Sequence, residues 1–164
     1  MQIEIFQADL TQSADAEAFL EALNAYALDP MGGGAPLSEY ARHHLIERLR
    51  DLPHAFSVLA LVDGRVAGLA NCFEGFSTFA CAPLINIHDF VVLPAFRGQG
   101  LAIKMMDRIE QIALEKGCCK ITLEVLSGNT VAQSLYQKVG FEAYALSEDA
   151  GQAEFWQKQL VSHH

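Results

Sequence analysis

The sequence lacks the features that mark several common classes of protein. No basic residue precedes Arg42, so the amino terminus lacks the charged region of a signal peptide. The most apolar stretch, 76–87, is too short to span a bilayer. No Cys-x-x-Cys pair occurs among the four cysteines, which are Cys72, Cys81, Cys118 and Cys119. We therefore expect reduced thiols in a cytoplasm, with no bound metal, no disulfide framework and no membrane contact.

Positive charge is also scarce in this chain. The 164 residues include 11 Lys and Arg against 20 Asp and Glu, a formal charge of −9. A nucleic-acid binder needs basic clusters to neutralise phosphates, so we expect no nucleic-acid partner. With 51% apolar residues and 19% charged ones, the chain can bury a sizeable core. The length suits a single domain, which we place at 1–162, followed by a terminal tail at 163–164.

The acidity is not uniform along the sequence. Residues 97–138 hold six basic and four acidic side chains, whereas the remainder of the chain carries the whole acidic excess. A basic region on an acidic protein predicts a local anionic ligand, but ordinary variation of surface charge explains the counts equally well. The motifs in this region have to decide between the two.

Hydrophobic periodicity, capping residues and turn residues predict alternating strands and helices. The segments with strand-like patterns are 2–6, 57–62, 65–73, 84–93, 119–125, 141–146 and 154–161. The segments with helix-like patterns begin at the capping residues Ser13 and Ser38, lie between Ala102 and Gly117, and occupy 130–139. This order, β-α-α-β-β-β-α-β-α-β-β, predicts an α/β fold of the α+β kind with a mixed sheet.

Between a buried strand and a helix lies the segment Arg97-Gly98-Gln99-Gly100-Leu101-Ala102. Glycines allow close backbone approach, and the unpaired N–H groups and dipole of a helix amino terminus favour an anion. Arg97 adds a guanidinium that can bind phosphate oxygens in a fork. The spacing matches neither a Walker A loop nor the dinucleotide fingerprint. A phosphate cradle and a plain tight connection both remain open for this segment alone.

A second motif follows the next predicted strand, at Asn129-Thr130-Val131-Ala132-Gln133-Ser134-Leu135-Tyr136-Gln137-Lys138-Val139-Gly140-Phe141. Together with Arg-x-x-Gly-x-Ala at 97–102, it resembles the two hallmark regions of the GCN5-related N-acetyltransferase (GNAT) family. The order of predicted elements agrees over nearly the whole chain. Gly-Phe-Ser-Thr-Phe at 75–79 and the strand carrying Asp89 look like the branch that acetylates polyamines and other small amines.

The resemblance implies the acyl-CoA N-acyltransferase fold and acetyl-CoA as the acyl donor, with no metal. It implies that backbone groups of Phe90, Val91 and Val92 pair with the pantetheine arm, where this strand splays from its neighbour. The diphosphate is then expected beside Arg97, on the main chain of Gly98, Gln99, Gly100, Leu101 and Ala102. Asn129 is expected to bond the pantetheine or to cap its helix, and homodimers are frequent in the family.

Acetyl transfer to an amine requires an unprotonated amine, a stabilised oxyanion and a proton for the departing thiolate. The resemblance places the Tyr136 hydroxyl near the CoA sulfur, and a phenol with the ordinary pKa of about 10 is protonated at neutral pH. We therefore predict that Tyr136 donates this proton. A tyrosine that only packs its ring in the core is the alternative.

His88 and Asp89 are the candidates for handling the amine. On a regular strand these successive residues face opposite sides of the sheet, with Asp89 on the face of Ile87 and Val91. The polyamine branch commonly has a Glu-Asp pair here, and His88 departs from it. His88 can accept a proton directly or through water, or it is satisfied by local hydrogen bonds. Asp89 needs a partner, either a backbone donor or a substrate ammonium.

The acceptor is expected under the connection between the first two helices. Asp29-Pro30-Met31-Gly32-Gly33-Gly34 is a candidate mobile lid, with Tyr26 and Met31 as candidate substrate contacts, or else a plain flexible connection. The cysteines are interpreted as small core residues rather than nucleophiles. The acidic remainder of the chain favours a small cationic amine acceptor. A peptide or protein acetyltransferase, and a non-catalytic acetyl-CoA sensor, are the alternatives.

Overall fold

In the computed structural model of this protein, which describes residues 1–161, the chain divides into two units at the junction of Leu123 and Glu124. The first unit contains the sheet and three helices, and the second contains one helix. The predicted tail at 163–164 lies outside the described residues. Among residues 1–161, no helix combines the length and the apolar character that crossing a membrane requires.

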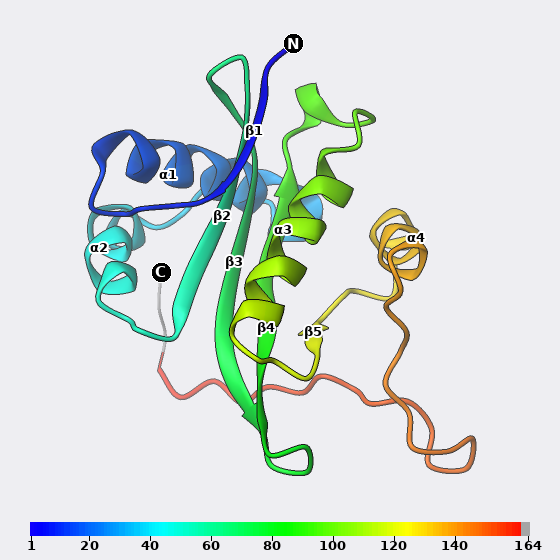
Figure 1. The fold of residues 1–164 in the computed structure, drawn as a ribbon. Helices are drawn as coiled ribbons and strands as arrows, with labels where there is room; N and C mark the ends of the chain where they lie inside the picture. The colour runs from blue at the N-terminus through cyan, green and yellow to red at the C-terminus, as the bar shows by residue number, and fades with distance from the viewer. Residues whose placement is uncertain (162–164) are drawn as a thin grey trace. The chain divides into compact units, whose positions relative to one another are not determined.

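The sheet of the first unit has five strands, in the order in which they occur along the chain (Figure 1). Its strands are β1 (Ile3–Gln7), β2 (Ala55–Val62), β3 (Arg65–Ser77), β4 (Ala82–Val92) and β5 (Ile121–Leu123). The first four pair antiparallel, and β5 pairs parallel to β4. The predicted mixed sheet is confirmed, although β5 is shorter than the expected 119–125.

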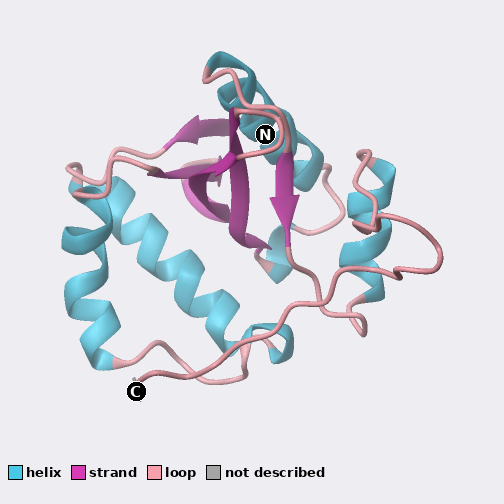
Figure 2. Ribbon diagram, turned by 90° about the horizontal axis from the view of Figure 1, so that it is seen from below, coloured by secondary structure: helices cyan, strands magenta, loops and turns pink. Residues whose placement is uncertain are grey.

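Helices cover both faces of this sheet (Figure 2). The α-helices of the unit are α1 (Ser13–Leu28), α2 (Glu39–Arg50) and α3 (Leu101–Glu115), and the 3-10 turns are η1 (Pro30–Gly32) and η2 (Pro94–Phe96). Helices α1 and α2 pack on one face, hereafter the α1/α2 face, where Phe19 and Leu23 meet Leu59 and Leu69. Helix α3 packs on the other, the α3 face, where Leu101 joins a second apolar cluster.

Two serines were expected to cap helices, and only one does so. The Ser38 Oγ accepts a hydrogen bond from the Ala41 backbone N–H at 3.1 Å, which satisfies one open donor at the start of α2. Ser13 is instead the first residue of α1, and the cap is Gln12, whose side chain accepts no capping bond. The prediction for Ser13 is therefore wrong by one position.

This difference gives a matched stability test. Ser38→Ala removes a capping bond, so the free energy of unfolding should fall by about 1 kcal/mol, which corresponds to about 2–4 °C in Tm for a chain of this size. Ser13→Ala removes the same hydroxyl from a position without a capping bond and should leave Tm within about 1 °C. Thermal unfolding followed by circular dichroism measures both, and equal Tm values for the two variants would contradict the cap.

Two β-bulges interrupt the sheet. The β2–β3 register shifts after Ala60 pairs with Gly68, which leaves Ala67 as the extra residue. The β3–β4 register shifts between Asn71, which pairs with Asp89, and Cys72, which pairs with Ile87, so His88 is the extra residue. A bulge breaks the strict alternation of side chains between the two faces. Both bulges change which residues share the α1/α2 face.

The second unit contains α4 (Thr130–Lys138), which agrees with the predicted helix. The two predicted closing strands at 141–146 and 154–161 are wrong. Between residues 141 and 161 the only bridge is that joining Ala145 and Gln152, closed by a turn at Ser147–Gly151. An alternating pattern states which side chains would share a face, but a strand also needs a paired neighbour along its length, and 154–161 has none here.

Candidate active site

The segment from η2 to α3 forms an open helix amino terminus. Gly98 and Gly100 have φ angles of 79° and 77°, in the left-handed region that glycine adopts without a Cβ penalty. Gly100 is the N-cap of α3 and offers no side-chain acceptor, so no side chain caps the first turn that begins at Leu101. A Cβ added at either glycine would meet nothing within 4 Å. This loop therefore presents backbone N–H groups and a helix dipole to an open space.

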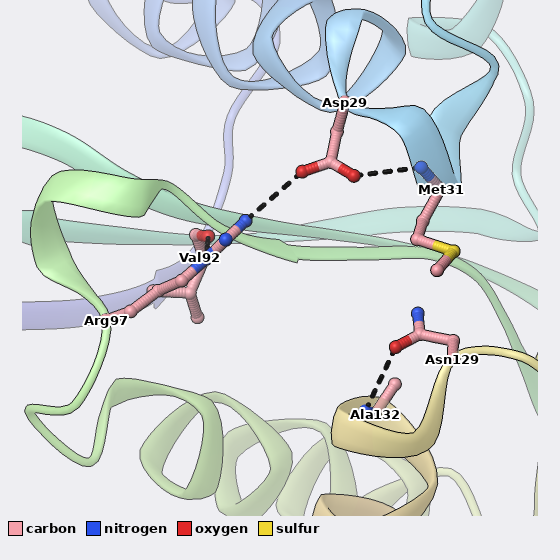
Figure 3. Close-up of polar contacts among 6 residues, drawn as sticks. All are labelled: Asp29, Met31, Val92, Arg97, Asn129 and Ala132. Carbon is pink, nitrogen blue, oxygen red and sulfur yellow. Dashed lines mark hydrogen bonds and ion pairs between the residues drawn. The ribbon is translucent and has the colours of Figure 1, made fainter.

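Arg97 is fixed at the entrance to this loop by two contacts (Figure 3). Its Nε donates to the Val92 carbonyl oxygen at 2.9 Å, and its guanidinium lies 3.5 Å from Asp29 Oδ2 in an ion pair. Half of the Arg97 side chain stays exposed. The guanidinium is thus held against the end of β4 and Asp29, from a residue just before the glycine loop, with donors left for an anion.

Strand β4 changes its neighbours along its length. Its ladder with β5 covers Ile85–Ile87, whereas its ladder with β3 continues to Val92. Beyond Ile87, no described strand pairs with the edge of β4 that faced β5. Phe90, Val91 and Val92 all lie in this part of β4, where an extended ligand can add to a strand edge.

The connection after α1 is more structured than a plain flexible loop. Asp29 caps η1, because its Oδ1 accepts from the Met31 backbone N–H at 2.9 Å, and its carbonyl accepts from Gly32 and Gly34 (Figure 3). The other carboxylate oxygen faces Arg97. Met31 itself is 42% exposed. The sequence placed Asp29 in the candidate lid but gave no sign of its ion pair with Arg97, because a pair 68 residues apart leaves no local signal.

Negative charge gathers near Tyr26 on the α1/α2 face. Burial raises the pKa of the half-buried Tyr26 hydroxyl, and the carboxylates of Asp89 and Asp29 raise it further. The phenol therefore stays protonated at neutral pH and is available as a hydrogen-bond donor. Tyr26, Asp29 and Asp89, hereafter the acidic corner, come from α1, the loop after it and β4. Because Asp29 is paired with Arg97, Asp89 is the carboxylate of this corner that is left to receive a further cation.

The bulge corrects the expectation for His88 and Asp89. Because His88 is the extra residue, it and Asp89 both turn to the α1/α2 face rather than to opposite faces, and Ile87 pairs on the α3 face with Cys72. The His88 ring, on an exposed residue, packs edge-on against Phe73 with ring centroids 5.6 Å apart. Phe73 itself packs against the cluster under α1 and α2.

The second unit holds the two motif residues Asn129 and Tyr136. The Asn129 Oδ1 accepts from the Ala132 backbone N–H at 3.2 Å, so the predicted helix-capping role is present (Figure 3). The partly buried Tyr136 ring packs edge-on against Phe141 at 5.9 Å. Gln133, which sequence reasoning passed over, donates to the carbonyls of Leu126 and Ser127 and ties the preceding loop to α4.

The cysteines do not form a nucleophilic site. Burial and the nearby Asp89 charge raise the pKa of Cys72 to about 12, and burial also raises that of Cys118. Their thiolates are therefore scarce at neutral pH. Only Cys72 is buried, so the interpretation of all four as core residues is wrong for Cys81 and Cys119, which are exposed. Among residues 1–161, no three His, Cys, Asp or Glu side chains gather to hold a metal ion.

Comparison with known proteins identifies the class of protein. Residues 17–141 match the acetyltransferase (GNAT) family. This match covers most of the chain and includes both the glycine loop and α4. The chain therefore belongs to the acetyltransferase (GNAT) family.

Particular relatives share parts of the chain. This chain is 36% identical over 72 residues to thialysine N-epsilon-acetyltransferase of Bos taurus. The match covers 44% of this chain and only 39% of that enzyme. The chain is 26% identical over 99 residues to aminoglycoside N(6')-acetyltransferase type 1 of Salmonella typhimurium, covering 58% of this chain and 68% of that one. The fold resembles aminoglycoside N-acetyltransferase AAC(6')-Iy in complex with CoA, with a TM-score of 0.71 and 23% identity over 97% of this chain and 96% of that chain.

Proposed function

We propose that this protein is an acetyl-CoA-dependent N-acetyltransferase that transfers the acetyl group directly to a primary amine of a small cationic substrate. The observation that carries the proposal is the open amino terminus of α3 behind two glycines, preceded directly by Arg97. Family membership and the CoA complex of a protein with the same fold support an acyl-CoA donor.

The donor is proposed to lie along β4 and the loop after it. The diphosphate binds the main chain of Gly98, Gln99, Gly100, Leu101 and Ala102 and the guanidinium of Arg97. Leu101 is buried and contributes its backbone only. The pantetheine amides pair with the edge of β4 at Phe90, Val91 and Val92, beyond the end of the β5 ladder. Asn129 caps α4 and, in this proposal, also contacts the pantetheine.

The acceptor is proposed to bind at the acidic corner on the α1/α2 face. Asp89 receives the ammonium group of the substrate, and Tyr26 and Met31 contact the rest of it. The charge of Asp89, which raises the Tyr26 pKa, supports a cationic substrate at this corner, whereas Asp29 is already paired with Arg97. The names of the relatives, a thialysine and an aminoglycoside acetyltransferase, also describe enzymes that act on amines.

The chemistry requires the amine nitrogen to lose two protons and the CoA sulfur to gain one. The substrate ammonium loses the first proton, for which His88 is the proposed acceptor, directly or through water. The neutral amine then attacks the thioester carbonyl, the C–S bond breaks, and the CoA thiolate takes a proton from Tyr136. The second proton leaves the former amine nitrogen and restores the Tyr136 hydroxyl through solvent. The products are the N-acetylated amine and free CoA, with one net proton released.

We further propose that residues 1–162 act as one domain. The family match runs from 17 to 141 and so continues across the junction at Leu123, which favours a single acetyltransferase domain over two independent parts. The loop between α1 and α2 is ordered by the η1 turn and the ion pair of Asp29, and we propose that it covers a small acceptor rather than an extended peptide.

The test is release of free thiol from acetyl-CoA in the presence of polyamines, amino sugars, amino acids and lysine peptides. We expect release with small cationic amines and little with lysine peptides. Preference for peptides would overturn the small-molecule assignment. Tight CoA binding, measured by calorimetry, without release for any amine would establish a sensor instead.

A further inference from the structure

Three polar side chains form a row across the α1/α2 face of the sheet. Ser57 on β2 pairs with Asn71 on β3, and Asn71 pairs with Asp89 on β4. The Ser57 Oγ donates to Asn71 Oδ1 at 2.6 Å, and Asn71 Nδ2 donates to Asp89 Oδ2 at 3.0 Å. These residues, here called the polar row, connect the interior of the sheet with the acidic corner.

The hydrogen bonds of the polar row can run in only one direction, with Ser57 donating to Asn71 and Asn71 donating to Asp89. A carboxylate accepts hydrogen bonds and donates none, so the Asn71 amide must turn its NH₂ group toward Asp89. Its carbonyl oxygen then faces Ser57, whose hydroxyl must donate. The hydroxyl of Ser57 therefore fixes the orientation of the Asn71 amide, and the amide fixes one oxygen of Asp89. Each member determines the next.

Stability alone does not explain the polar row. Ser57 and Asn71 are each 4% exposed, and the neighbouring strand residues Leu59 and Leu69 are wholly buried. Hydrogen-bonded polar groups in such surroundings add little net stability, and replacing both partners with apolar groups of similar shape is nearly neutral. The row does provide a carboxylate of fixed orientation at its Asp89 end, on the face where the Tyr26 phenol lies.

We propose that Ser57 and Asn71 are positioning residues that hold the Asp89 carboxylate in the orientation that receives the ammonium group of the acceptor. The inference rests on the proposed function and extends it to two buried residues that touch neither substrate. Asn71 occupies Oδ2 of Asp89, so Oδ1 is the oxygen that meets the ammonium. Ser57 acts through Asn71, and Asn71 acts through Asp89.

The first measurement is steady-state kinetics with spermidine as the acceptor. In Ser57→Ala and Asn71→Leu, the KM for spermidine should rise about tenfold, the effect of losing a hydrogen bond to a charged group. The KM for acetyl-CoA and the kcat at saturating spermidine should stay within about twofold of the unmodified protein. Equal changes in both KM values would indicate a merely structural role. Ser57→Ala, which removes one hydroxyl, carries the test if Asn71→Leu does not fold.

The matched control is Thr122→Val. Thr122 Oγ1 on β5 accepts from Asn86 Nδ2 on β4 at 3.0 Å, so the change removes a cross-strand hydrogen bond of the same kind outside the polar row. It should leave the KM for spermidine unchanged. A tenfold rise in this control as well would contradict a role specific to the polar row.

A double-mutant cycle tests whether Asn71 acts through Asp89. Asp89→Asn alone should raise the KM for spermidine more than Asn71→Leu does, because the charge itself is lost. Adding Asn71→Leu to Asp89→Asn should raise it no further. Additive effects of the two substitutions would overturn the inference.

Spermidine binding without turnover, measured by calorimetry with CoA present, separates this inference from the proposed function. If the unmodified protein binds spermidine without acetylating it, and Asn71→Leu weakens that binding tenfold, the positioning role of the polar row is supported and the proposed catalytic activity is wrong. If acetylation occurs and Asn71→Leu does not change the KM for spermidine, the proposed catalytic activity is supported and the positioning role of the polar row is wrong. No binding and no turnover with any amine of the panel would overturn both.

Discussion

Tyr136→Phe should bind acetyl-CoA almost as tightly as the unmodified protein and lose most of its turnover. Proton donation by a positioned side chain typically contributes about 10²–10⁴-fold to a rate, so kcat should fall within that range. The phenylalanine ring keeps the edge-on contact with Phe141 and removes only the hydroxyl. Calorimetry with acetyl-CoA and thiol release at several pH values measure the two quantities.

The control for this variant is Tyr144→Phe in the same unit. Tyr144 is 60% exposed and lies outside the motif, so loss of its hydroxyl should leave kcat unchanged. Unchanged rates for Tyr136→Phe at every pH would refute proton donation by Tyr136. A parallel loss of acetyl-CoA affinity would show instead that the phenol holds the donor.

Gly100→Val should weaken acetyl-CoA binding by about 100-fold, which corresponds to about 2.7 kcal/mol. The φ angle of 77° is one that a β-branched residue adopts only with strain, and the added side chain would occupy the open space at the amino terminus of α3. Both effects disturb the N–H groups that are proposed to bind the diphosphate. Titration with CoA measures the loss.

Gly117→Val separates this effect from general damage to α3. Gly117 lies just past the other end of the same helix, with a φ angle of 74° and nothing within 4 Å of an added Cβ. Its backbone strain should therefore be similar, so Tm should fall by a similar amount while CoA affinity stays unchanged. Full affinity in Gly100→Val would mean that the phosphates bind elsewhere.

Much of the fold could be predicted because its signals are local. The Ser38 cap and the end of the third helix before Gly117 each depend on residues a few positions apart, and both occur as expected. The glycine loop is equally local, so its position at the start of α3 followed from its own sequence. The two closing strands failed because pairing depends on a distant partner that an alternating pattern does not specify.

The polar row was harder to predict because two bulges determine it. A regular two-residue hairpin would pair Ser57 with Ala70, but the extra residue at Ala67 shifts the register and brings Asn71 opposite Ser57. The extra residue at His88 then brings Asp89 opposite Asn71. Neither bulge has a sequence signal that period-two alternation reveals, so the hydrogen bonds of the polar row could be recognised only in the folded sheet.

The unequal surroundings of the cysteines affect how liberated CoA can be quantified. A disulfide reagent that detects the thiol of free CoA also reacts with the exposed thiols of Cys81 and Cys119, which contribute a fast background signal. The Cys72 thiol does not react with the reagent on that timescale, because it is buried and its pKa is raised to about 12. Cys118 is half-buried and its pKa is also raised, so it reacts between these extremes. Labelling located at Cys72 itself therefore marks molecules whose sheet has opened, and the same reagent follows both product formation and the integrity of the catalyst.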